Sequence, residues 1–103
     1  MAKFADDAGI SEHLALMLKA LAHPARLRIV AALCEGGVNV GELASRLGLE
    51  PAIVSQQLRI LRMSGLVEAT RSEGFALYRL AQPPLMELVA CLEKCPCATK
   101  KGR

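Results

Sequence analysis

Residues 40–65 contain the pattern that most restricts the fold of this chain, two short helices separated by a tight turn. Apolar residues recur at helical spacing up to Leu47, and Gly48 marks the helix end because glycine readily adopts the left-handed conformation of a helix stop. Pro51 suits the first turn of the second helix, where its missing N–H is not needed, and Gly65 marks the end of that helix. Two helices joined by a short Gly-containing turn predict a helix-turn-helix.

The second of these helices has one apolar and one polar side. Helical spacing puts Val54, Leu58 and Leu61 on the apolar side. The opposite side carries Ala52, Ser55, Gln56, Arg59 and Met63. Hydroxyl, amide and guanidinium groups are the groups that read base edges in a DNA major groove. An ordinary solvated helix face would have the same composition, so this helix alone does not decide between the two interpretations.

The segment after the helix-turn-helix favours the DNA-binding interpretation. Residues 66–71 and 75–80 are runs with β-branched or aromatic residues and rough alternation, separated by Ser72-Glu73-Gly74. Two such runs around a Gly-containing turn predict a β-hairpin. A helix-turn-helix followed by a hairpin is a winged helix, in which Arg71 and Arg79 would contact phosphates.

Several of these segments together resemble the ArsR/SmtB family of bacterial transcriptional repressors. The resemblance covers about residues 12–95, and the matching motifs lie at residues 18–29, 40–44, 54–62, 65–67 and 78–80. It implies a homodimer that binds double-stranded operator DNA, with Arg62 added to the DNA-binding residues, and that releases the operator when a metal, a metalloid or a thiol-reactive signal is sensed. Members of the family often have a basic residue after the wing glycine, and Phe75 stands there in this chain.

The remaining chain predicts a mainly α-helical winged helix-turn-helix with four helices, a β-hairpin wing and a fifth helix. Apolar residues make up 52% of the 103 residues and aromatic residues 3%, which favours packed helices in a single domain. We expect a flexible tail over residues 1–9, the domain over residues 10–95, and a short Cys-containing basic tail over residues 96–103. Ser11 is the expected N-cap of a first helix through Ala22, and Pro24 and Pro83-Pro84 begin the second and fifth helices.

The first and last helices each carry an apolar stripe. These stripes are Leu14, Met17, Leu18 and Leu21 on the first helix, and Leu85, Leu88, Val89 and Leu92 on the last. A second subunit is the natural cover for the stripe of the last helix. The family resemblance implies that the first helix packs against the last helix across the dimer, so we expect a homodimer through these two helices.

Three of the four cysteines lie within seven residues, at Cys91, Cys95 and Cys97. Cys91 and Cys95 are one helical turn apart, and Pro96 breaks the helix so that Cys97 can fold back toward them. Three converging thiolates suit As(III) or Sb(III), and soft thiolates also suit Cd, Pb, Hg and Cu(I). We therefore expect such an ion as the inducer, with no cofactor needed for DNA binding. The simpler alternative is an interface cysteine at Cys91 with two incidental tail residues.

Cys34 lies on the apolar stripe of the second helix, which predicts a buried core cysteine. The alternative is a persulfide-sensing or redox-sensing repressor with a dithiol switch between Cys34 and Cys97. The family resemblance includes members with one cysteine on each of these two helices. Their first cysteine aligns with Ala31, one turn before Cys34, and their second with Cys97.

Other function classes have little support. A metallochaperone or thiol oxidoreductase would not explain the polar helix face or the wing. No catalytic triad, carboxylate pair or phosphate-binding glycine loop indicates an enzyme. His13 and His23 lie near helix starts and are expected as caps or surface residues rather than metal ligands. No signal sequence and no apolar run of about 18 residues is present, so we expect a cytoplasmic protein without a membrane span. The net charge of +3 is compatible with nucleic acid as a partner.

Overall fold

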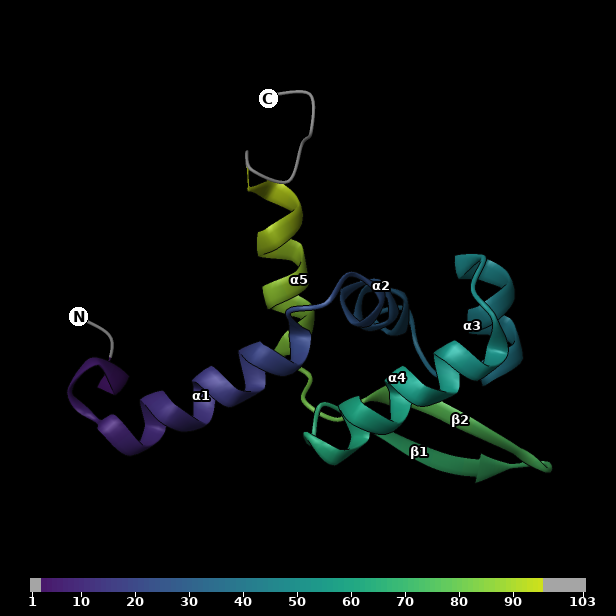
Figure 1. The fold of residues 1–103 in the computed structure, drawn as a ribbon, viewed down its shortest axis with the longest axis horizontal. Coiled ribbons are helices and arrows are strands. Elements are labelled where there is room, and N and C mark those ends of the chain that lie inside the picture. The colour runs from purple at the N-terminus through teal and green to yellow at the C-terminus, as the bar shows by residue number, and fades with distance from the viewer. Residues whose placement is uncertain (1–2, 96–103) are drawn as a thin grey trace.

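The computed structural model describes residues 3–95, which fold as five α-helices and one antiparallel hairpin (Figure 1). A 3-10 helix, η1, precedes the first α-helix. The elements in chain order are η1 (Lys3–Asp6), α1 (Ala8–Leu21), α2 (Pro24–Leu33), α3 (Val40–Leu47), α4 (Pro51–Met63), β1 (Val67–Ser72), β2 (Phe75–Leu80) and α5 (Leu85–Lys94). The expected winged helix-turn-helix is therefore confirmed.

The start of α1 differs from the sequence expectation. Asp7, not Ser11, is the N-cap, and its side chain accepts a hydrogen bond from the backbone N–H of Ile10 at 3.0 Å. Ser11 lies inside the helix, and its hydroxyl donates to the carbonyl of Phe4 at 2.6 Å. The prediction of Ser11 as the cap was wrong because Asp7, with its extended backbone, satisfies the free N–H groups one turn earlier. The last residues assigned to the N-terminal tail are consequently helical.

Helices α2, α3 and α4 surround one hydrophobic core. The side chains of Ile29, Leu43, Val54, Leu58 and Leu61 are fully buried there, at 0% exposure. Leu66 and Val67 at the start of the hairpin complete the core together with Leu21 and Leu85. The apolar stripe that the sequence predicts on α4 is thus confirmed as the inner side of that helix.

The hairpin joins the core through the segment before α3. Strands β1 and β2 pair with Val67 opposite Leu80 and Ser72 opposite Phe75. Val38 and Tyr78 exchange two backbone hydrogen bonds of 3.0 and 2.9 Å, so a short bridge links the α2–α3 connection to β2. Ser72 belongs to β1, and the turn consists only of Glu73 and Gly74.

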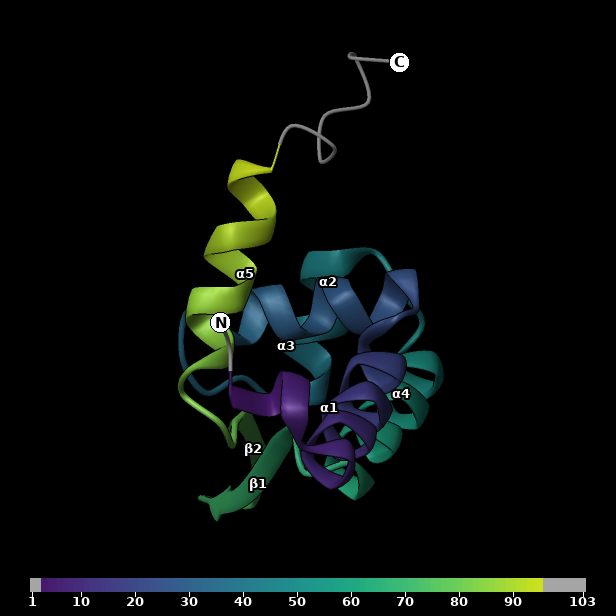
Figure 2. The same cartoon turned by 90° about the vertical axis from the view of Figure 1, so that its left-hand side faces the viewer.

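Helices α1 and α5 extend away from this core. Figure 1 shows α1 reaching one end of the long axis while α3 and the hairpin tip lie at the other. In Figure 2, turned by 90°, the C-terminal part of α5 extends beyond the other helices, while its first turns lie beside α2. Leu85 anchors its first turn in the core, whereas Leu92 near its end is 43% exposed. Helix α5 ends at Lys94 with Cys95 in an extended conformation, as expected before a proline.

Candidate nucleic-acid interface

Local sequence fixes the angle between α3 and α4. Asn39 and Glu42 form a capping box at the start of α3, in which each side chain accepts a hydrogen bond from the backbone N–H of the other residue. Gly48 adopts φ of 68° at the end of α3, a left-handed conformation that favours glycine. Pro51 then begins α4 only three residues later. These features hold the two helices in the helix-turn-helix arrangement.

All seven residues predicted to contact DNA are exposed. They are Ala52, Ser55, Gln56, Arg59 and Arg62 on α4, Arg71 on β1 and Arg79 on β2. Within residues 3–95, Arg59, Arg62 and Arg71 form no salt bridge, so these three guanidinium groups remain available to phosphates or bases. The exposed surface of α4 therefore combines hydrogen-bonding side chains with unpaired positive charge.

The two adjacent glutamines of α4 have different environments. Gln56 is exposed on the outer side, whereas Gln57 is half-buried. The side-chain oxygen of Gln57 accepts a hydrogen bond of 2.9 Å from Nη1 of Arg26 on α2. The guanidinium Nε of Arg26 also donates to the carbonyl of Ala20 at the end of α1. Sequence reasoning missed this contact because the two residues lie 31 positions apart and no local pattern connects them.

A second arginine of α2 acts on the helix-turn-helix. Nη2 of Arg28 donates to the carbonyl of Leu47, in the last turn of α3, at 2.8 Å. That carbonyl belongs to the group that an α-helix leaves without an internal partner. Arg28 therefore fixes the end of α3 against α2.

The wing carries balanced charge. Nε of Arg79 lies 3.2 Å from a carboxylate oxygen of Glu68 on the neighbouring strand. Arg71 is paired with Ala76 across the hairpin and has no acidic neighbour there. Glu73 at the turn adopts a positive φ of 50°, and Phe75 beside the turn is 59% exposed. The wing therefore offers one arginine without a salt bridge, and an exposed aromatic ring beside a turn that carries Glu73.

The cysteines near the end of α5 are only partly within the described chain. Cys91 lies on α5 and is exposed, whereas Cys95 is the C-cap of α5 and is half-buried. Cys97 lies outside the described residues. Over residues 3–95, no group of three His, Cys, Asp or Glu side chains is placed to bind a metal ion.

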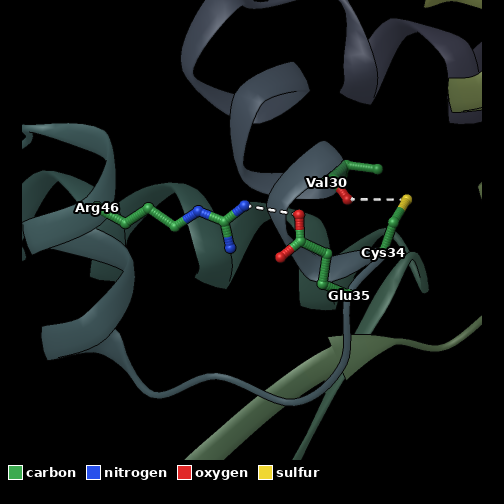
Figure 3. Close-up of polar contacts among 4 residues, drawn as sticks. All are labelled: Val30, Cys34, Glu35 and Arg46. Carbon is green, nitrogen blue, oxygen red and sulfur yellow. Dashed lines mark hydrogen bonds and ion pairs between the residues drawn. The ribbon is translucent and has the colours of Figure 1, made fainter.

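Cys34 is not a core residue. It forms the C-cap of α2, is half-buried, and its Sγ lies 3.5 Å from the carbonyl of Val30 (Figure 3). The expected core position was wrong because the last buried residue of α2 is Leu33, and the chain turns away after it. Burial, followed by the negative charges of Glu93 and Glu35, raises the pKa of the Cys34 thiol. Glu93 belongs to the last turn of α5, so the negative charge of this helix end acts on the Cys34 thiol.

The residue after Cys34 connects α2 to α3. Glu35 accepts a hydrogen bond of 2.7 Å from Arg46, and Figure 3 shows its side chain directed toward α3 while Cys34 points away from Arg46. This contact lowers the pKa of Glu35 and raises the pKa of Arg46. Of the two residues that follow α2, Glu35 thus binds a residue of α3, and Cys34 is influenced by the charge of a residue of α5.

The histidines agree with the interpretation made from sequence. The Nδ1 atom of His23 accepts a hydrogen bond of 3.1 Å from the backbone N–H of Ala25 and caps α2. His13 is exposed on α1.

An apolar groove of about 830 Å³ runs between α1, the end of α4 and the start of α5. Its lining residues are His13, Leu14, Leu16, Met17, Met63, Ser64, Gly65, Leu66, Gln82, Pro84, Leu85 and Leu88. Leu16 is 68% exposed and Leu18, two residues later on α1, is 50% exposed. Within the part of the chain that the structure covers, no helix is both long and apolar enough to cross a membrane.

Comparison with known proteins supports the same conclusion as the geometry. Residues 23–69 match the family described as bacterial regulatory protein, arsR family. The biofilm growth-associated repressor of Xylella fastidiosa is 41% identical over 91 residues, which is 88% of this chain and 80% of the relative. The crystal structure of the Xylella fastidiosa repressor BigR superposes with a TM-score of 0.83 at 38% identity, covering 96% of this chain and all of BigR.

Two further structures are similar. A homodimeric winged helix-turn-helix DNA-binding domain from Mycobacterium bovis has a TM-score of 0.75 at 30% identity, covering 90% of this chain and 84% of the other. Reduced HlyU from Vibrio cholerae has a TM-score of 0.78 at 32% identity, covering 86% of this chain and 94% of HlyU.

The exposed polar face of α4, the helix-turn-helix and the hairpin define a DNA-binding transcriptional regulator of the winged-helix class, and not an enzyme. Within that class, the chain belongs to the arsR family of bacterial regulatory proteins. The family membership expected from sequence is confirmed.

Proposed function

We propose that this protein is a homodimeric repressor that inserts α4 into the major groove of its operator. The observation that carries the proposal is the division of α4 into two sides. Val54, Leu58 and Leu61 are fully buried, so Ser55 and Arg59 face outward from a helix that the core holds in place. Arginine pairs with guanine through two hydrogen bonds, and serine can bond to either bases or phosphates.

The dimer interface we propose consists of α1 and α5. Leu16 and Leu18 on α1 are 68% and 50% exposed, and Leu92 on α5 is 43% exposed. The groove between these helices would receive the same surface of a second copy, as a two-fold interface requires. The homodimeric state of the Mycobacterium bovis domain supports this assignment.

The inducer we propose is a thiophilic metalloid or metal ion, with As(III) or Sb(III) favoured and Cd, Pb or Hg as further candidates. Cys91 on α5 and Cys95, the C-cap of α5, lie four residues apart, and Cys97 follows two residues later. Sulfur ligands select soft ions over Mg²⁺ or Ca²⁺. Because α5 also belongs to the proposed interface, an ion bound there would act on the relative position of the two subunits.

A dithiol switch between Cys34 and Cys97 is the second candidate, in which the repressor senses persulfides or oxidants. It is favoured by the position of Cys34, which lies outside the core and near Glu93 of α5. A reduced form of the similar protein HlyU has been described. The raised pKa of Cys34 lowers the fraction of reactive thiolate at this residue. Peroxide would oxidise one of the two thiols to a sulfenic acid and release water, and attack by the other thiol on that sulfur would form the disulfide and release a second water. A persulfide donor would transfer its outer sulfur to one thiol and leave as a thiol, and attack by the other cysteine would form the disulfide and release hydrogen sulfide.

Operator release tests both candidates. DNA selected from a random pool by the protein serves as the operator, and fluorescence anisotropy follows its release. We expect As(III) or Sb(III) to release the DNA at stoichiometric amounts and to produce near-ultraviolet sulfur charge-transfer absorption. Release by peroxide or a persulfide donor, with no response to As(III), Sb(III) or Cd(II), would replace the metalloid proposal with the dithiol switch.

A further inference from the structure

The side chain of Arg26 links three helices, and the function proposed above does not use this contact. Arg26 on α2 donates to the Ala20 carbonyl of α1 and to the Gln57 side chain of α4. One side chain therefore connects the helix of the proposed dimer interface with the helix proposed to read DNA. Arg26 is half-buried and makes no salt bridge with any carboxylate of residues 3–95.

The acceptor on α1 is a group that needs a partner. Ala20 lies in the last turn of α1, where the helix leaves its final carbonyls without internal hydrogen bonds. The neighbouring carbonyls of Lys19 and Leu21 accept from the backbone N–H groups of Ala22 and His23. Arg26 supplies the donor for Ala20, so the guanidinium is part of the end of α1 as well as of α2.

The acceptor on α4 is the side-chain oxygen of one glutamine. Gln57 is half-buried and uses its side-chain oxygen for Arg26, whereas its neighbour Gln56 is exposed. A planar guanidinium donates in fixed directions, which makes such a contact more sensitive to helix rotation than apolar packing is. A small rotation of α4 would therefore break the contact with Gln57 or the contact with Ala20.

We propose that Arg26 is a positioning residue, which holds α4 at the rotation and distance from α1 that operator binding requires. Gln57 is its partner on α4 and does not read DNA, while Gln56 does. This inference rests on the proposed function, since it assumes that α4 enters the major groove. It also assigns different roles to two identical adjacent side chains.

A double-mutant cycle tests the proposal. The variants are Arg26→Lys, Gln57→Met and their combination, with Gln56→Met as the matched control. Lysine keeps the positive charge but cannot reproduce the forked geometry of arginine. We expect each single variant to bind the selected operator about tenfold more weakly, the size expected for one hydrogen bond to a charged group. The combination should also lose about tenfold rather than about a hundredfold, because both changes break the same contact.

The salt dependence separates positioning from direct DNA contact. For Arg26→Lys and Gln57→Met, we expect an unchanged slope of log K against log salt concentration and unchanged affinity for non-specific DNA. Wild-type operator affinity in Arg26→Lys would assign to Arg26 a simple charge contact and overturn the proposal. Losses that multiply in the combination would overturn it as well.

Gln57→Glu provides a conservative rescue. A carboxylate still accepts from the guanidinium, so Gln57→Glu should retain operator affinity within about threefold of wild type while Gln57→Met does not. Equal losses in both variants would show that Gln57 reads DNA directly and would overturn the assignment. Thermal unfolding of each variant confirms that the domain remains folded.

The control distinguishes this inference from the proposed function. Gln56→Met should change base preference at one position of each half-site, and its effect should multiply with that of Arg26→Lys. If Gln56→Met leaves base preference unchanged, the proposed docking of α4 fails. If Gln56→Met changes base preference but the Arg26 and Gln57 losses multiply, only the positioning role fails.

Discussion

Arg79 and Glu68 face each other across the two strands of the wing, with 3.2 Å between Nε and the carboxylate oxygen. Arg79 is therefore already paired before any DNA arrives, and a phosphate would have to compete with Glu68. Both side chains are about half exposed, so the pair itself adds little stability. Its main consequence is to reduce the positive charge that the wing presents.

The wing pair leads to a prediction about DNA affinity. Glu68→Gln removes the competing carboxylate and should tighten binding to all DNA sequences alike, by about twofold to threefold for an exposed pair. Arg79→Ala should weaken binding to all sequences and flatten the salt dependence, and Arg71→Ala should do so more strongly because Arg71 forms no salt bridge within residues 3–95. Anisotropy titrations at several salt concentrations measure both effects. Unchanged affinity and salt slope in both arginine variants would remove the wing from the interface.

Arg59 is predicted to read a base. Arg59→Ala should weaken specific binding by about 1–3 kcal/mol and relax sequence preference at one position of each half-site. The control Lys19→Ala removes the same charge outside the helix-turn-helix and should leave base preference intact. Selection from randomised operators measures the preference. A uniform loss across all sequences would instead make Arg59 a phosphate contact.

Assembly is predicted to depend on the exposed leucine of α5. Leu92→Glu should produce monomers, because the dimer would have to bury a charge in an apolar interface. Leu88→Glu should do the same but also destabilise the domain, since Leu88 packs against the core of its own chain. Sedimentation velocity reports the state, with Leu92→Met as the apolar control. A Leu92→Glu dimer that binds DNA normally would exclude α5 from the interface.

Single cysteine substitutions separate the two sensing chemistries. Serine keeps the size of cysteine but lacks the soft sulfur, so each variant should bind DNA normally without inducer. We expect Cys91→Ser, Cys95→Ser and Cys97→Ser to lose release by As(III), while Cys34→Ser still responds. If Cys34→Ser no longer releases the operator when the inducer is added, while Cys91→Ser releases it normally, the dithiol switch is the mechanism.

Cys34 should react slowly with alkylating reagents at neutral pH. Its raised pKa means that less of the reactive thiolate is present at any given pH below that value. In a variant with serine at the other three cysteines, the midpoint of the pH–rate profile should lie above that of a free cysteine. Glu93→Gln should lower the midpoint. The raised pKa also makes the free energy of unfolding depend on pH. The contribution of the neutral Cys34 thiol is fully present below the pKa of the thiol in the unfolded chain, and it is lost as the pH rises through the pKa in the folded protein. An unchanged midpoint in Glu93→Gln would contradict an influence of α5 on Cys34.

Local chemistry made most of the fold predictable. Gly48 and Pro51 restrict their own backbone, and the spacing of Val54, Leu58 and Leu61 has the helical period, so α3 and α4 follow from the sequence alone. The N-cap of α1 was misplaced because Asp7 and Ser11 are both good caps, and only the structure shows that Asp7 accepts from Ile10 while Ser11 donates to Phe4. Cys34 was misplaced because helical periodicity does not show where a helix ends.

Long-range contacts of the candidate site were not predictable from the sequence. The exposed residues of α4 follow from periodicity, but the different roles of Gln56 and Gln57 depend on where Arg26 lies. The pairing of Glu68 with Arg79 requires the hairpin register, which depends on the turn being Glu73-Gly74 alone. Such contacts arise from tertiary packing, which leaves no periodic signal in one sequence.

The bridge between Val38 and Tyr78 has a mechanical consequence. Two backbone hydrogen bonds tie the wing to the segment that leads into α3, and the core ties α3 to α4. These contacts connect the wing with α4 within one protomer, so we expect the two to move together when the position of a protomer changes. In the proposed dimer, an inducer bound near α5 would then act on the distance or tilt between the two protomers. The signal would change how well the two protomers match the spacing of the operator half-sites.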